Sequence, residues 1–150
     1  MFKNILVPTD GSKLSDKAVA HAVALAKSAG AKLTALTVTP VFHMRPISGF
    51  SPPDSMLAPV RESFEKEASA KSRKILDTAC ATASAAGVAC AGVQVRSESP
   101  FDAIIKQATK SKCDLILMAS HGRRGLDAVL LGSETQKVLT HTKIPVLVVR

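Results

Sequence analysis

The sequence predicts an α/β fold in which a five-stranded parallel sheet is doubly wound, with helices on both of its faces. Short apolar runs alternate with longer amphipathic segments, in the order strand, helix, strand, long loop, helix, strand, helix, strand, helix, strand. The run Leu115–Ala119 is apolar at every position, which is typical of a strand buried on both faces. The chain has 150 residues, the length of one domain, so we expect a single domain over residues 1–150.

The N-terminal segment predicts a βαβ unit. Lys3–Val7 forms the first strand, a helix capped by Ser12 runs to about Ala29, and Lys32–Val38 forms the second strand. This arrangement places Asp10 at the carboxyl end of the first strand, where open α/β sheets bind ligands. Asp10 is equally compatible with a structural role in the turn that follows the strand.

The middle of the chain is less regular. Residues 39–58 contain four prolines, and their apolar side chains show no helix or strand periodicity. They therefore predict a long loop, which either covers a ligand or a partner subunit or is disordered. A helix is expected from Pro59 to Ala86, because proline is favoured at the first helical position. Val88–Arg96 then predicts a strand at a sheet edge, and Ser99 the cap of the next helix.

The segment after Leu115–Ala119 has the chemistry of an anion site. Residues 120–125 contain two glycines and two arginines in place of core-forming side chains. Ser133 and Gln136 stand at capping-box spacing, which predicts a helix that begins here, and the N-terminus of a helix attracts phosphate. The combination predicts a phosphate or nucleotide site. The alternative is that these glycines, arginines and Ser133 serve only the turn and the cap.

Composition excludes several classes of protein. The net charge is +8, but the basic residues are dispersed and there is no Trp or Tyr to stack on bases, so nucleic acid is not an expected partner. Three cysteines without a CxxC pair and four scattered histidines argue against a disulfide framework or a metal site. No apolar run predicts a membrane span or a signal peptide, and we expect a cytoplasmic protein.

The final apolar run predicts the fifth strand and an interface. Pro145 at its start favours an edge position, because proline cannot donate to a neighbouring strand. An apolar edge leaves a row of backbone groups that can pair with a second copy. We therefore expect a homodimer through Val146, Leu147, Val148 and Val149.

Four stretches of this chain, ILVPTDGS, DLILMASHGRRG, LLGSETQKVL and IPVLVV, resemble the universal stress protein family along the whole length. ATP-binding members of that family carry G-x-x-G, nine residues, then G-S or G-T. Gly122, the nine residues that follow and Gly132-Ser133 match, whereas Ala119 stands at the position of the first glycine. The resemblance implies a Rossmann-like, adenine nucleotide α-hydrolase-like fold that holds ATP across the carboxyl ends of strands one and four.

By motif position, the resemblance implies a set of nucleotide-binding residues. The base and ribose side comprises Pro8, Thr9, Asp10, Val38, Met118 and Ala119, and the phosphate side comprises Gly122, Gly132, Ser133 and the N–H of Glu134. Arg123 and Arg124 could add charge-assisted contacts. Mg²⁺ could bridge the phosphate oxygens and needs no dedicated protein ligand.

The function implied is that of an ATP-binding, homodimeric stress-response regulator with protein partners that the sequence does not identify. The alternative is a dimeric scaffold of the same fold that binds no nucleotide and acts through protein contacts. We expect at most slow ATP hydrolysis and assign no catalytic residue, because the chain has neither a G-x-S-x-G elbow nor a P-loop.

Overall fold

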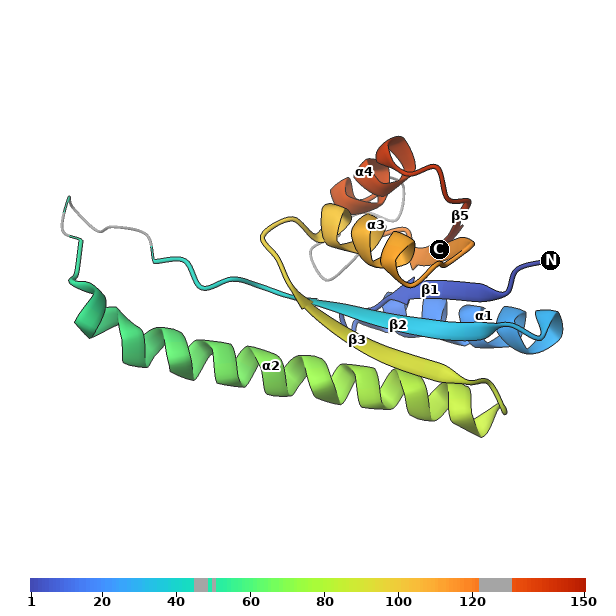
Figure 1. Ribbon diagram of the computed structural model, residues 1–150, viewed down its shortest axis with the longest axis horizontal. Coiled ribbons are helices and arrows are strands. Elements are labelled where there is room, and N and C mark those ends of the chain that lie inside the picture. Colours follow the sequence, from blue (N-terminus) through green and yellow to red (C-terminus); the bar gives the residue numbers. More distant parts are fainter. Residues whose placement is uncertain (45–48, 50, 122–130) are drawn as a thin grey trace.

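The computed structural model describes residues 1–44, 49, 51–121 and 131–150, and in it five parallel strands form one sheet (Figure 1). The strands are β1 (Asn4–Pro8), β2 (Lys32–Thr39), β3 (Cys90–Arg96), β4 (Leu115–Ala119) and β5 (Val146–Val149). Their order across the sheet is β3-β2-β1-β4-β5, so β1 is central and β3 and β5 are the edges. The predicted fold and both predicted edge strands are confirmed.

Helices cover both faces of the sheet (Figure 1). The helices are α1 (Lys13–Ala29), α2 (Asp54–Ala85), α3 (Pro100–Lys110) and α4 (Ser133–His141). Residues of α1 and α2 share one buried cluster with Ile5 and Val7, and residues of α3 and α4 share the other with Leu6 and Leu36. Among the described residues, no helix combines the length and the apolarity needed to cross a bilayer.

The caps of α1 are as predicted. The Ser12 side chain accepts a hydrogen bond from the Ser15 N–H at 3.2 Å, and Gly30 ends the helix in the left-handed region with φ 65°. A residue with a Cβ is strained at that backbone conformation, so glycine suits it. The predicted range of α1 is therefore confirmed by contacts at both ends.

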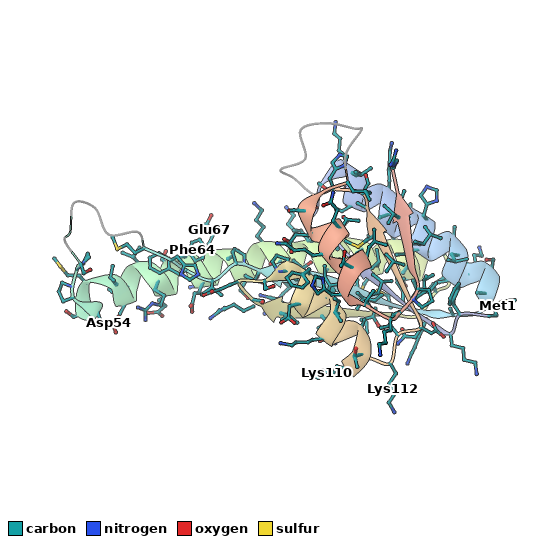
Figure 2. The ribbon with its side chains drawn as sticks, turned by 90° about the horizontal axis from the view of Figure 1, so that it is seen from above. Met1, Asp54, Phe64, Glu67, Lys110 and Lys112 are labelled. Atoms are coloured by element: carbon teal, nitrogen blue, oxygen red, sulfur yellow. The ribbon has the colours of Figure 1, made fainter. Side chains whose placement is uncertain are left out.

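Helix α2 begins at Asp54, so the prediction that it begins at Pro59 is wrong, and so is the prediction of loop structure for residues 54–58. Pro53 occupies the N-cap position, and Asp54 pairs with Arg61 at 2.8 Å. A proline in the second turn costs one backbone hydrogen bond, but its fixed φ is helical. The first turns of α2 project beyond the sheet (Figure 1), and Figure 2 places Asp54 and Met1 at opposite ends of the molecule.

At the amino end of the sheet, Asp114 joins β4 to the start of β1. Its two carboxylate oxygens accept hydrogen bonds from the N–H groups of Lys3 at 2.8 Å and Asn4 at 3.0 Å. Desolvation alone would raise the pKa of Asp114, but these N–H donors outweigh it and hold the pKa below its ordinary value of 3.8. The ionised carboxylate therefore stabilises the folded state.

We expect Asp114→Ala to lower the free energy of unfolding by about 1–2 kcal/mol at pH 7, because two charge-assisted hydrogen bonds are lost. Asp77→Ala removes an exposed carboxylate and serves as the control, with little expected change. Since the folded-state pKa is lowered, the contribution is complete above about pH 4 and disappears as pH falls through the folded-state pKa. Urea unfolding of both variants at several pH values measures this; an unchanged difference down to pH 2 would contradict the assignment.

Candidate functional site

The candidate site lies where β1, β2 and β4 end, at the carboxyl edge of the sheet. The chain leaves β1 toward β2 on one side, and β4 later pairs with β1 on the other side. Side chains and loops diverge at such a reversal of strand order, which is where open α/β sheets bind ligands. The residues that follow β1 and β4 therefore lie at the same edge of the sheet.

Thr9 is held firmly at the carboxyl end of β1. Its N–H donates to the Leu36 carbonyl at 2.8 Å, and its own carbonyl accepts from the Thr37 hydroxyl at 3.1 Å. Its hydroxyl lies 3.1 Å from the Ser15 hydroxyl, and the residue is only 5% exposed. Thr9 thus fixes the turn against β2 and α1.

Asp10 forms the turn that was predicted as its structural alternative to ligand binding. Its Oδ1 accepts a hydrogen bond from the Ser12 N–H at 3.0 Å, and Gly11 between them has φ 73°. Such an Asx turn tethers the carboxylate and sets its direction. This geometry gives Asp10 a structural role. It also places Asp10 at the carboxyl end of β1, next to the half-buried Pro8.

The other residues expected near the base are packed into the two core layers. Val38 is half-buried against the cluster beneath α3 and α4, and Met118 belongs to that cluster at 5% exposure. Ala119 belongs to the opposite cluster at 8% exposure, and its carbonyl accepts from the Thr135 hydroxyl at 3.1 Å. Met118 and Ala119 therefore point to opposite faces of the sheet, as neighbours on a strand must.

Gly132 brings the start of α4 against the end of β4. Its N–H donates to the Ser120 carbonyl at 2.8 Å, and the Ser120 N–H donates to the Val149 carbonyl at 2.7 Å. A Cβ at position 132 would lie 3.0 Å from both Cα and Cβ of His121. Glycine is needed here by the protein's own packing, and its amide is already engaged within the chain.

The predicted capping box at Ser133 and Gln136 is wrong by one residue. Gly132 is the N-cap, with φ −61° and ψ 150°, and no side chain among the described residues caps this first turn. Ser133 is exposed and is the first helical residue, while the Gln136 amide donates to the Leu131 carbonyl at 3.1 Å. Gly132 fits the N-cap because the Cβ of a serine cap would lie only 3.0 Å from His121 Cα, so His121 would have to shift.

Glu134 has a structural contact that the sequence did not indicate. Its carboxylate accepts from the Phe101 N–H at 2.8 Å and pairs with Lys137 at 3.0 Å. The predicted cap residue Ser99 is at the N-cap of α3 but makes no side-chain capping bond, so Glu134 satisfies that helix end instead. The only local signal was an acidic residue in the first turn of α4.

Three of the expected site residues, Gly122, Arg123 and Arg124, lie outside the described residues. Beside them, the Ser120 hydroxyl and His121 Nδ1 are 3.0 Å apart. Within the part of the chain that the structure describes, no group of three or more His, Cys, Asp or Glu side chains could hold a metal ion. A cation at this site would have to be held mainly by ligand oxygens and water.

The described residues therefore place a tethered carboxylate after β1 and the N-terminus of α4 after β4 at the same edge of the sheet. The N–H groups of Ser133 and Glu134 lie in the first turn of α4, where the helix supplies no carbonyl partner. Together with the helix dipole, these amides favour a negatively charged group. The donor set suits phosphate oxygens.

The chain matches the family model described as "Universal stress protein family" over residues 1–150. It belongs to the universal stress protein family. This universal stress protein is 34% identical over 153 residues to YxiE of Bacillus subtilis, with 100% of each chain covered. It is 33% identical over 150 residues to a universal stress protein of Thermus aquaticus, again with 100% of each chain covered.

Solved structures confirm the same fold. The hypothetical protein MJ0577 superposes with a TM-score of 0.82 at 25% identity, covering 99% of this chain and 96% of that one. A universal stress protein in complex with cAMP superposes with a TM-score of 0.70 at 30% identity, covering 99% and 97%. A relative of this protein therefore binds an adenine nucleotide.

We expect Gly132→Ala to destabilise the protein by about 1–3 kcal/mol, because the new methyl group must displace the backbone of His121. Gly92→Ala is the matched control, since a Cβ there meets Leu76 Cβ at 3.4 Å, an ordinary contact. Thermal unfolding of both variants under reducing conditions compares them. Equal stability of the two variants would show that His121 moves away from the new methyl group without a loss of stability.

Proposed function

We propose that this universal stress protein is a cytoplasmic, homodimeric regulator that binds ATP across the carboxyl ends of β1 and β4. The observation that carries the proposal is the N-terminus of α4, whose first-turn amides belong to the same edge of the sheet as Asp10. The relative that binds cAMP supports an adenine nucleotide as the class of ligand. Pro8, Thr9 and Asp10 would contact the nucleoside.

The phosphates would lie against the N–H groups of Ser133 and Glu134. The Gly132 N–H donates to Ser120 and is therefore assigned to holding the loop rather than the ligand. Gly122, Arg123 and Arg124 remain proposed phosphate contacts on the family motif. A net charge of +8 favours anionic ligands generally. Mg²⁺, where bound, would neutralise phosphate oxygens.

Ala119 is compatible with this site. Among the residues that the structure describes, Lys112 is the only non-glycine residue with a positive φ, so the backbone at position 119 is open to any residue type. The extra methyl group of alanine points into the buried cluster beneath α1 and α2. Replacement of the motif glycine therefore costs no backbone strain.

We expect isothermal titration calorimetry to detect ATP with Mg²⁺, and Asp10→Asn to weaken binding about tenfold, because the amide loses the charged acceptor while it can keep the Ser12 turn. Asp16→Ala, which removes an exposed carboxylate from the first turn of α1, is the control. AMP and cAMP are titrated in parallel. Equal affinity for AMP and ATP would contradict the placement of the outer phosphates at α4.

The alternative, a scaffold that binds no nucleotide, predicts no heat with any of these ligands at millimolar concentration. The side-chain contacts of Glu134 favour it in one respect, because they give that residue a role without a ligand. The same titration therefore decides between the two functions.

The proposed dimer uses the free edge of β5. The carbonyls of Pro145 and Val149 accept from the Ile116 and Ser120 N–H groups at 2.9 and 2.7 Å, so the backbone groups of the alternate residues point away from β4. Leu147 on this edge is 41% exposed. An apolar edge of this kind suits pairing with a second copy.

We expect light scattering to give the mass of a dimer for the wild type and of a monomer for Leu147→Lys, since a lysine at the centre of the edge opposes pairing. Leu139→Lys is the matched control, because Leu139 is 42% exposed and belongs to helix α4 rather than to the edge strand. A wild-type monomer at micromolar concentration would refute the dimer.

A further inference from the structure

Helix α2 and strand β3 fold back on one another and bring two cysteines together. The turn that joins them includes Gly87 with φ 75° and a hydrogen bond from the Val88 N–H to the Ala83 carbonyl at 2.9 Å. Cys80 is in the last turns of α2, and Cys90 is the first residue of β3. The two positions are therefore on facing layers, close to the turn.

The two layers approach to ordinary side-chain contact at Gly92 of β3. A Cβ at Gly92 would lie 3.4 Å from Leu76 Cβ and 3.6 Å from Cys80 Sγ. Cys90 is on the same face of β3 as Gly92, two residues earlier, and Cys80 is one helical turn after Leu76. Disulfides require Cβ atoms about 3.5–4.5 Å apart, so the layer spacing is suitable.

Both cysteines pack against the same buried cluster and are within reach of solvent. Burial first, and then the hydrogen bond and charge of Cys80, raise the pKa of Cys90 from 9.0 to about 12. Both cysteines are half-buried and line a surface cavity with Arg73, Asp77 and Gln94. Cys113 differs, because it is 6% exposed and belongs to the cluster on the other face of the sheet.

We propose that Cys80 and Cys90 are a redox modification site, which peroxides oxidise to a reversible intramolecular disulfide that fastens α2 to β3. The proposal is independent of nucleotide binding, since it concerns the α2 side of the sheet and an edge strand distant in order from β4.

The chemistry needs one peroxide for each disulfide. The Cys80 sulfur attacks one peroxide oxygen, the O–O bond breaks, and hydroxide leaves and takes up a proton as water, which gives a sulfenic acid on Cys80. The Cys90 sulfur then attacks the Cys80 sulfur, its proton leaves with the displaced hydroxide as water, and the S–S bond forms. Two thiols are oxidised, and the peroxide is reduced to water.

Cys80 is the first nucleophile because Cys90 stays protonated at neutral pH. Cys90 therefore gives up its proton only in the second step, when the displaced hydroxide takes it up as water.

The test uses the full chain and hydrogen peroxide. Residues 75–96 contain both cysteines and, before Arg96, no Lys or Arg, so trypsin releases them as one peptide. After peroxide, denaturation and alkylation with iodoacetamide, we expect this peptide without alkyl groups and lighter by two hydrogen atoms. Dithiothreitol before alkylation should restore two alkyl groups. The sulfoxide of Met56, which is 65% exposed, reports the peroxide dose.

Variants separate the proposed pair from other oxidation products. Cys80→Ser and Cys90→Ser should each abolish the internal link, and Cys113→Ala should oxidise as the wild type does. Gly92→Val should slow the reaction several-fold, because its methyl groups would push α2 away from β3. Oxidation should also raise the melting temperature of the wild type reversibly, and not that of Cys80→Ser.

Two results would overturn the proposal. One is a peptide that keeps two alkylated cysteines when Met56 is largely oxidised. The other is oxidation of Cys80 only to sulfinic acid or to links between chains, which would show that Cys90 does not reach it.

Discussion

The burial of β1 between β2 and β4 is the constraint on which the rest of the structure depends. Ile5, Leu6 and Val7 are each 0% exposed, because α1 and α2 cover one face of this strand and α3 and α4 the other. A strand with apolar neighbours on every side cannot carry polar chemistry along its length. The polar residues are therefore displaced to the two ends, Asn4 at one and Thr9 with Asp10 at the other.

The two ends of the central strands have different roles. At the amino end, each carboxylate oxygen of Asp114 accepts a hydrogen bond from the Lys3 or the Asn4 amide, and these bonds join β4 to β1. At the carboxyl end, backbone contacts of Gly132 hold α4 against β4, and Thr135 adds a hydrogen bond to Ala119. These contacts hold the N-terminus of α4 at the carboxyl edge of the sheet. The helix is thus positioned without using its own first-turn amides at Ser133 and Glu134.

The sequence predicted the elements whose signals are local. The strands follow from apolar runs, and the ends of α1 follow from Ser12 and Gly30, each of which acts within a few residues. The start of α2 was missed because Pro53 and Pro59 are both acceptable near a helix start. The cap of α4 was missed because Gly132 is selected by contact with His121, which is eleven positions away. Likewise, the bond from Phe101 to Glu134 spans 33 positions.

The sequence predicted where the candidate site lies, but not which of its groups are already bonded within the chain. Asp10 and the start of α4 were identified because the strand order follows from the βαβ pattern, and the order fixes which strand ends are neighbours. Which backbone amides are already used within the chain depends on packing, and residue types do not reveal it. Gly132 illustrates this limit. The family motif assigns this residue to phosphate binding, whereas its N–H donates a hydrogen bond to the Ser120 carbonyl.

The two edge strands differ in a way that explains why association is expected at one of them. Gln94 and Arg96 on β3 are polar and exposed, and Arg96 pairs with Glu65 of α2 at 3.0 Å. Polar side chains on an edge, together with a helix packed beside it, discourage further pairing. Strand β5 consists of four aliphatic residues and carries no charge until Arg150. The β5 edge is therefore the one we propose for pairing with a second copy, whereas β3 contacts α2 at Gly92.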